Sequence, residues 1–197
     1  MLFLHTAGWM ACVVYCTIPS FWLVVHPYAE YWRARRRSPY RVLLPVWLGM
    51  WILVGTVTWP WRRFEIYSTP VAWAPAIVLF LIGVLLYVGG AKHFTKSQLG
   101  GRPEVENART EQRLVTGGLR SRIRHPIYLG HFFEMLGWSI GTGLPVLFLL
   151  TAFAVVTGAI MLRQEDRELE QRFGDAYREY QRSVPAVIPQ FFANRSD

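Results

Sequence analysis

Residues 124–166 read RHPIYLGHFFEMLGWSIGTGLPVLFLLTAFAVVTGAIMLRQED, and this stretch decides the fold class. It holds two long apolar runs, Ile127 to Gly143 and Leu144 to Leu162, joined at a junction that contains Gly and Pro. A junction this short leaves room only for a tight turn between two antiparallel helices. Ionisable residues flank both sides of the predicted hairpin: Arg124, His125, Glu165 and Asp166.

Three further apolar runs precede the hairpin, at Leu2 to Val25, Val42 to Trp59 and Val71 to Gly90. A helix needs about 20 residues to cross a bilayer, and each run is close to that length. The chain of 197 residues is 52% hydrophobic and only 17% charged, whereas soluble domains average about 25% charged residues. We therefore expect an all-α polytopic membrane helical bundle with about five transmembrane helices, forming a single domain over residues 1–197.

Two polar segments complete the predicted architecture. The first is a loop before helix four, Ala91 to Arg124, whose Gly and Pro residues divide it into turns. The second begins at Arg163, and its apolar residues recur every three or four positions, as in an amphipathic helix. Pro185 and Pro189 are expected to end this carboxyl-terminal helix.

The basic residues predict the orientation, because short cytoplasmic loops retain Lys and Arg. Lys and Arg gather after the first, third and fifth apolar runs, and only Arg62 and Arg63 follow the second. We expect the amino terminus outside and the carboxyl terminus in the cytoplasm of a plasma or inner membrane or of the endoplasmic reticulum. No basic residue precedes Arg33, so the first run lacks the charged start of a cleavable signal peptide and is expected to stay as a span.

Several function classes are disfavoured by the same pattern. The net charge of +8 does not predict nucleic-acid binding, because Lys and Arg lie between apolar runs and form no stripe on one element. The five histidines are scattered and show no paired ligand spacing, so no metal site is expected. Cys12 and Cys16 lie four apart in an apolar helix and are expected to be small core residues.

Glu165 and Asp166 stand where acids are not expected. They lie four and three residues before Leu169, on or beside the apolar face of the predicted helix. Glu165 has no basic residue three or four positions away, and Asp166 has only Arg163. We expect the pair to bind a cationic group outside its own helix. The alternative is an ordinary solvated helix start, where acids also suit the dipole.

The other flank of the hairpin favours the opposite charge. Proline fits the first turn of a helix, so Pro126 is expected to begin helix four, with His125 at its mouth. The free backbone amides of that turn and the neighbouring Arg124 together favour an anionic group. The alternative is that Arg124 and His125 are ordinary anchors at the end of a span.

Short motifs follow one another along the second half of the chain: Leu114-Val115-Thr116-Gly117-Gly118, Arg124-His125-Pro126-Ile127-Tyr128 with Gly130, Glu165-Asp166, Leu169, Phe173-Gly174, Tyr177, Tyr180 and Val184-Pro185 to Pro189. In this order they resemble the catalytic core of the isoprenylcysteine carboxyl methyltransferase and phospholipid methyltransferase superfamily. The resemblance implies an S-adenosylmethionine-dependent membrane methyltransferase with a catalytic core over residues 92–190. Two positions depart from the family pattern: Arg120 replaces a common Tyr, and Asp166 replaces the usual second Glu.

The resemblance also implies which residues bind the cofactor: Leu114, Gly118, His125, Pro126, Tyr128, Glu165 and Asp166. The first two would contact the adenosine part, and the two acids would hold the methionine amino group. An acidic pair suits an ammonium, and an Arg at a helix mouth suits the methionine carboxylate.

The methyl acceptor is expected to be a lipid or a lipidated small molecule or protein that arrives from the bilayer. The leading expectation is a carboxylate, as in isoprenylcysteine O-methylation, which needs no general base and which Arg124 would orient. An amine such as phosphatidylethanolamine must lose a proton, and then His131 and Glu134, on one face of helix four, are the candidate bases. A purely structural role for these two residues is the alternative.

Two other classes stay open. Sterol and steroid reductases share part of this architecture and bind a nicotinamide cofactor in a similar place. A reductase needs a strongly basic pocket for the extra phosphates, and Glu165-Asp166 argues against one. A non-enzymatic membrane protein or small transporter is disfavoured because the polar residues gather at one end of the spans, not at their middle.

Overall fold

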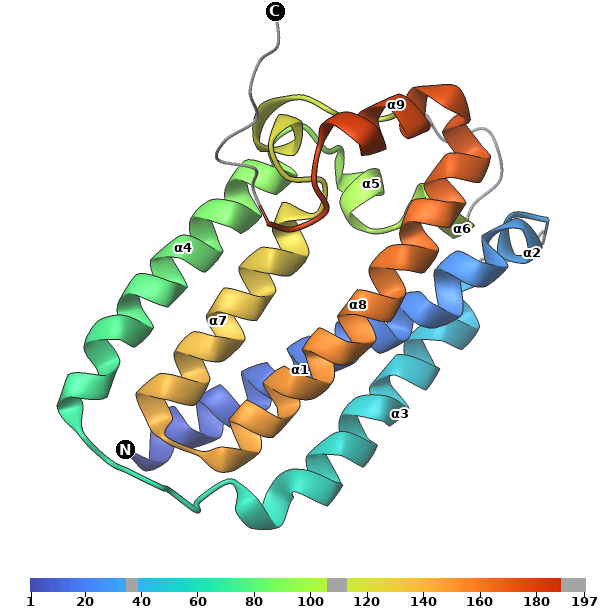
Figure 1. Ribbon diagram of the computed structural model, residues 1–197. Helices are drawn as coiled ribbons and strands as arrows, with labels where there is room; N and C mark the ends of the chain where they lie inside the picture. Colours follow the sequence, from blue (N-terminus) through green and yellow to red (C-terminus); the bar gives the residue numbers. More distant parts are fainter. Residues whose placement is uncertain (35–38, 106–112, 189–197) are drawn as a thin grey trace, which may run out of the picture.

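The computed structural model describes residues 1–34, 39–105 and 113–188, and every regular element in these ranges is a helix. Five long helices lie alongside one another (Figure 1): α1 Leu2–Val25, α3 Tyr40–Thr58, α4 Trp73–Ala91, α7 Pro126–Thr142 and α8 Pro145–Phe173. Short helices connect them or cover one end: η1 His26–Tyr28, α2 Ala29–Arg33, η2 Trp59–Trp61, η3 Pro70–Ala72, α5 Lys96–Leu99, α6 Arg102–Val105, η4 Gly118–Ser121 and α9 Asp175–Ser183. The predicted all-α class is confirmed.

Four segments are long and apolar enough to cross a membrane: Leu2–Arg33, Tyr40–Trp61, Pro70–Ala91 and Pro145–Phe173. The fourth predicted span also forms a helix, α7, and its 17 residues lie at the short end of the range of about 17–25 residues that a crossing takes. Its glycines explain how it fits among the longer helices. A Cβ atom on Gly130 would lie 2.8 Å from the carbonyl oxygen of Gly83 on α4, so the two backbones approach as only small residues allow.

The carboxyl-terminal helix differs from the prediction. No boundary exists at Arg163, because nothing there stops a helix, and α8 continues for 29 residues to Phe173. The break comes at Gly174, whose φ of +60° suits glycine, and α9 then turns back as a separate amphipathic helix. Pro185 lies just past the end of α9, as predicted; Pro189 lies outside the described residues.

The main core lies between α1, α7 and α8. Cys12 and Cys16 are fully buried in it as free cysteines, beside Met135 of α7 and Leu147 of α8. Their predicted role as small core residues is confirmed. This core fixes α7 against α8, so the residues at the adjoining ends of these two helices are held in a constant relation.

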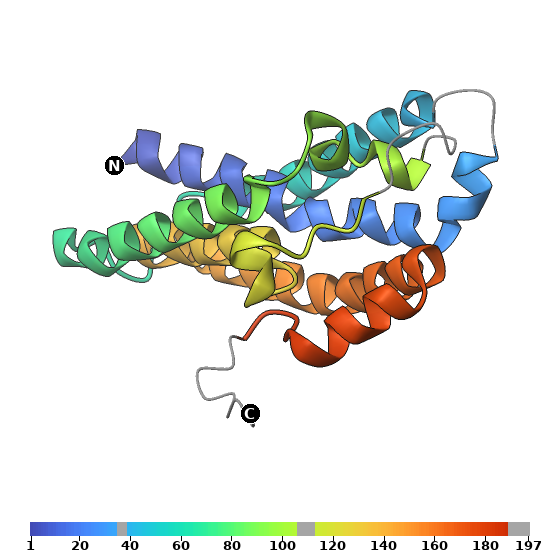
Figure 2. The ribbon, with the colours of Figure 1, turned by 90° about the horizontal axis from the view of Figure 1, so that it is seen from above.

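The tail after α8 lies at one end of the bundle (Figure 1) and runs back beside α8 (Figure 2). Tyr177 and Tyr180 of α9 pack with Leu114 of the loop, and the Tyr180 hydroxyl donates to the carbonyl oxygen of Arg120 at 2.6 Å. The backbone amide of Arg124 donates to the Pro185 carbonyl at 2.9 Å. The loop before α7 and the tail after α8 are therefore tied together over the ends of the helices.

Candidate active site

The two ionisable clusters predicted on either side of the hairpin meet in space. The Nε2 atom of His125 lies 3.0 Å from Oδ1 of Asp166, and Nη2 of Arg124 lies 3.2 Å from its Oδ2. His125 caps α7 and Pro126 occupies its first turn, as the sequence predicts. The close approach of the basic mouth of α7 and the acidic stretch of α8 is confirmed.

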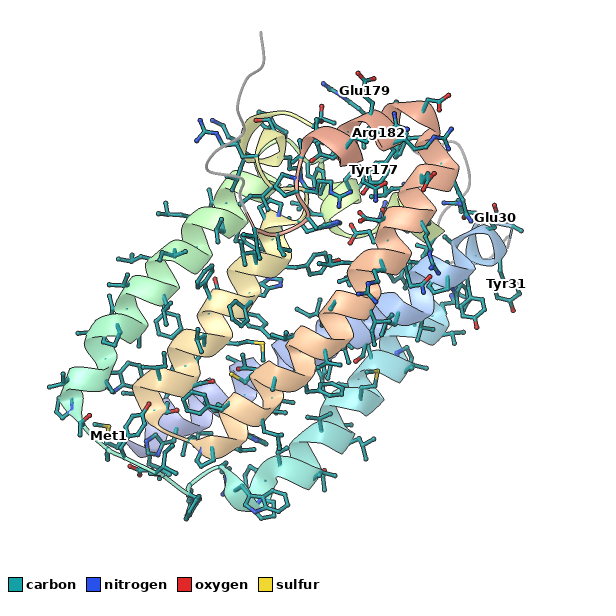
Figure 3. The ribbon with its side chains drawn as sticks, viewed as in Figure 1. Met1, Glu30, Tyr31, Tyr177, Glu179 and Arg182 are labelled. Atoms are coloured by element: carbon teal, nitrogen blue, oxygen red, sulfur yellow. The ribbon has the colours of Figure 1, made fainter. Side chains whose placement is uncertain are left out.

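Asp166 is fully engaged by neighbouring side chains. Besides Arg124 and His125, it accepts hydrogen bonds from the Tyr177 hydroxyl and, at 3.4 Å, from Nε2 of Gln181. Burial and the Asp166 carboxylate both raise the pKa of Tyr177, so this hydroxyl stays a donor. Figure 3 shows Tyr177 on the side of α9 that faces the other helices, whereas Glu179 lies on the opposite side. Asp166 therefore connects α9 to the amino-terminal end of α7.

Glu165 has a different environment from its neighbour. It borders a cavity, and its Oε2 atom is buried without a hydrogen-bond partner among the described residues. Nδ1 of His125, 3.5 Å from Oε2, is likewise unpartnered there. Tyr128 of α7 lies close to Glu165 and also lines the cavity. The two adjacent acids therefore differ: Asp166 is hydrogen bonded to other elements of the protein, whereas Oε2 of Glu165 is buried beside the cavity and accepts no hydrogen bond from the described residues.

The cavity has a volume of about 500 Å³, within the usual range for small-molecule sites of about 300–1,000 Å³. Apolar and aromatic side chains from α1 and α3 line part of it: Ile18, Phe21, Trp22, Leu44 and Trp47. Charged and histidine side chains from η1, α6, α7, α8 and the segment before α7 also line it: His26, Glu104, Arg113, Arg120, Arg124, His125, His131, Glu165 and Arg172. One space therefore offers both a lipid-like and a charged surface.

Unpartnered polar atoms gather around this cavity. Buried side-chain atoms without a hydrogen-bond partner in the described ranges are His26 Nδ1 and Nε2, Glu104 Oε2, Arg124 Nε and Nη1, His125 Nδ1, Glu165 Oε2 and, away from this group, Trp51 Nε1. Every one of them except the Trp51 atom belongs to a residue that lines the cavity. Buried polar atoms are costly unless they are paired. Their concentration here indicates a polar ligand.

The predicted site residues divide into two groups. Those that line the cavity are Leu114, Arg124, His125, Tyr128, His131 and Glu165. Those that lie beside it are Gly118, Pro126, Glu134 and Asp166. Gly118 faces His93, and Pro126 packs against Gly90 of α4. Among the described residues, no group of three or more His, Cys, Asp or Glu side chains is arranged to hold a metal ion.

His131 and Glu134 each contact another helix. The Tyr15 ring of α1 stacks on His131 with ring centroids 4.9 Å apart, and Glu134 packs against Gly83 of α4, where a Cβ atom would lie 2.6 Å from the Glu134 Cγ. His131 borders the cavity and Glu134 does not. The contact to another helix, one of the two structural roles considered from the sequence, is therefore present for both residues.

Sequence reasoning gave no site role to four charged or ionisable residues at or near the site. Arg120 was noted only as a departure from the family pattern. It donates to the carbonyl oxygens of Arg124 at 2.7 Å and Gly90 at 3.2 Å, so it joins the loop to α4 and to the start of α7. His26, Glu104 and Arg33, the partner of Glu168, lie in no recognisable motif, and the packing of η1 against α8 and of α2 against α6 brings them to the cavity region.

A helical bundle with four candidate membrane spans and a cavity lined by both charged and apolar side chains is typical of an integral membrane enzyme. The particular family follows from comparison with known proteins. The phospholipid methyltransferase family model matches residues 71–176, more than half of the chain, and the chain belongs to this family of integral membrane methyltransferases. Methyltransferases of this family use S-adenosylmethionine as methyl donor.

Individual relatives carry different names. The chain is 30% identical over 143 residues to methanethiol S-methyltransferase 1 of Bradyrhizobium diazoefficiens, covering 66% of this chain and 48% of that protein. It is 37% identical over 79 residues to protein-S-isoprenylcysteine O-methyltransferase of Schizosaccharomyces pombe, covering 39% and 33%. It is also 34% identical over 88 residues to the Delta(14)-sterol reductase TM7SF2 of Mus musculus, covering 42% and 21%. The chain thus spans less than half the length of these relatives.

Proposed function

We propose that this protein transfers the methyl group of S-adenosylmethionine to an acceptor with an apolar body. The observation that carries the proposal is the group of unpartnered buried atoms around one cavity, because they offer both signs of charge. Oε2 of Glu165 complements an ammonium, and Nε and Nη1 of Arg124 complement a carboxylate. The amino-acid end of the cofactor carries these two groups.

The protein's own contribution is binding, orientation and exclusion of water. When bound, the cofactor supplies a methyl group that is already activated by the sulfonium, so no activating residue is required. Asp166 holds Arg124 and His125 in fixed positions, and a fixed geometry is worth more to a displacement reaction than additional functional groups. Phe21, Trp22 and the other apolar lining residues keep the reacting centre poor in water.

The apolar lining of the cavity also supports an acceptor that comes from the bilayer. The apolar lining residues come from α1 and α3, both candidate spans, and they border the same cavity as the charged residues. The core predicted over residues 92–190 would therefore supply only part of the site, and we propose residues 1–197 as the functional domain. The two methyltransferases among the named relatives are named for isoprenylcysteine and for methanethiol as acceptors, and each acceptor has an apolar part.

Calorimetry with the detergent-purified protein tests the cofactor assignment. We expect S-adenosylhomocysteine to bind and NADPH not to bind. Glu165→Gln should weaken S-adenosylhomocysteine binding by about 10- to 100-fold, because a charge-assisted hydrogen bond contributes about 1.5–3 kcal/mol. Glu170→Gln is the matched control, since that side chain lies on the same helix, is 39% exposed and pairs with Arg178. Binding of NADPH alone would overturn the proposal in favour of a reductase.

We also propose the orientation predicted from the basic residues, with the carboxyl terminus and the cavity on the cytoplasmic side. A reporter that works only in the cytoplasm should be active when fused after Asp197 and inactive when inserted after Ser68, between α3 and α4. The reverse pattern would contradict the orientation. Activity at both positions would contradict an odd number of crossings between them.

A further inference from the structure

The cavity has a second polar region that the proposed contacts to the cofactor's amino-acid end do not use. His26 and Glu104 line it, and they come from parts of the chain outside the family motifs. The packing of η1 against α8 and of α2 against α6 brings both residues to this side of the cavity. They are a candidate for the place where the acceptor's reacting group lies.

His26 is built into the wall with no internal partner for its ring nitrogens. Its residue is 5% exposed, and both Nδ1 and Nε2 are buried without a hydrogen bond among the described residues. The ring stacks on Trp22, with centroids 5.2 Å apart and the planes inclined by 26°. Stacking fixes the ring, so its nitrogens are available in a defined position to a group that enters from the apolar side.

One carboxylate oxygen of Glu104 has an ion-pair partner, and the other has no hydrogen-bond partner among the described residues. Its Oε1 lies 3.4 Å from Nη2 of Arg172, while Oε2 is buried without a partner among the described residues. Burial raises the pKa of Glu104 to about 7, with Arg172 acting in the opposite direction. A carboxyl group that titrates near neutral pH is well matched to accepting a proton under physiological conditions.

The charges around these two residues favour one class of acceptor. His26 and Glu104 both interact electrostatically with Glu165, Glu168 and Arg172. His26 also interacts in this way with His125. Arg172 already faces Glu104 and Glu168, so it is not an open site for another anion. An incoming carboxylate would meet the Glu104 carboxylate, whereas an amine or a thiol would meet a hydrogen-bond acceptor.

We infer that His26 and Glu104 form the acceptor end of the cavity, and that the acceptor's reacting group is a nucleophile that carries a proton, an amine or a thiol. This inference rests on the proposed function and replaces the carboxylate predicted from the sequence. A nitrogen–carbon or sulfur–carbon bond forms as the methyl–sulfonium bond breaks, and the electron pair of that bond stays on the cofactor sulfur. The nucleophile's proton passes to Oε2 of Glu104 and then to water, while His26 positions the nucleophile.

Methyl transfer from labelled S-adenosylmethionine to three probes tests the acceptor class. The probes are phosphatidylethanolamine in vesicles, decanethiol and S-farnesylcysteine with a blocked amino group. We expect methylation of the amine or the thiol and not of the carboxylate. The rate should rise as the pH increases through about 7, because Glu104 accepts a proton only when it is ionised.

Glu104→Gln should lower kcat by about 100-fold or more, with a much smaller change in KM, and should remove the rise with pH. Glu104→Asp should keep that rise at reduced kcat, and Glu170→Gln should behave as the wild-type protein. Calorimetry should give the same Kd for S-adenosylhomocysteine within about twofold in Glu104→Gln, which also shows that the variant is folded.

The possible failures point to different causes. If wild-type protein does not bind S-adenosylhomocysteine, the proposed function itself is wrong. If it binds but methylates only S-farnesylcysteine or none of the probes, the acceptor assignment is wrong. Wild-type activity in Glu104→Gln would overturn the role of this carboxyl group. A tenfold loss of S-adenosylhomocysteine binding in that variant would place Glu104 in the cofactor site.

Discussion

Asp166→Asn is expected to lose both conformational stability and cofactor binding. The Asp166 carboxylate is only 15% exposed and faces Arg124, which is 8% exposed, together with His125 and Tyr177. Removing one partner of a buried ion pair costs about 3–5 kcal/mol, because the remaining charge stays buried without compensation. The free energy of unfolding in detergent should fall by about this amount, and S-adenosylhomocysteine should no longer bind measurably.

Two control variants test whether the effect of Asp166→Asn is specific to this carboxylate or would follow the loss of any acidic side chain. Asp175→Asn on α9 removes a carboxylate that is 95% exposed and pairs with Arg178, so its stability should change by less than about 1 kcal/mol. Glu165→Gln should weaken binding while leaving the unfolding transition nearly unchanged, since Oε2 of Glu165 accepts no hydrogen bond from the described residues and faces Nδ1 of His125 only at 3.5 Å. Normal stability and normal binding in Asp166→Asn would show that the Asp166 carboxylate does not hold α9 against the first turn of α7.

The contrast between Glu165 and Asp166 marks the limit of what the sequence could predict. Helical periodicity correctly placed both acids near the apolar face, and the absence of nearby bases correctly indicated partners on other elements. The sequence assigned one shared role to the pair. Their roles divide because α9 turns back at Gly174 and brings Tyr177 to Asp166 but not to Glu165. A turn of that kind is a tertiary event and leaves no pattern within the helix.

The sequence predicted where the helices lie more accurately than where they end. Hydrophobic length correctly identified α1, α3, α4 and α8 as candidate spans, and the fourth predicted run is helical as α7, with 17 residues at the short end of the crossing range of about 17–25. The extension of α8 to Phe173 was missed because a change from apolar to polar residues was taken as a boundary. Composition alone does not end a helix; a residue such as Gly174 with a positive φ does.

His26 and Glu104 illustrate what local sequence cannot reveal. His26 stands at the end of an apolar span, where a histidine is an ordinary anchor. Glu104 stands in a four-residue helix with no motif around it. Each becomes unusual only when its buried atoms are seen to lack partners beside the same cavity. Such a feature belongs to the packing of distant segments.

Glu168→Gln is expected to produce a loss of stability as large as that of Asp166→Asn. The Glu168 carboxylate is 3% exposed and accepts hydrogen bonds from Nη1 of Arg33 at 2.8 Å and from Nε of Arg172 at 2.9 Å. Arg172 stands four residues after Glu168 within α8, whereas Arg33 comes from α2. Glutamine would leave Arg33 uncompensated and Arg172 paired with Glu104 alone, so the free energy of unfolding should fall by about 3–5 kcal/mol.

A double-mutant cycle with Arg33→Gln identifies the cause of that loss. Because each single variant leaves a buried charge unpaired, the double variant should cost less than the sum of the two by at least about 1 kcal/mol. Strict additivity would show that Arg33 and Glu168 do not stabilise each other. Arg33 ends α2, which packs against α6, the helix that carries Glu104. Loss of the pair should therefore slow methyl transfer more than it weakens S-adenosylhomocysteine binding, because the acceptor end of the cavity depends on these two short helices.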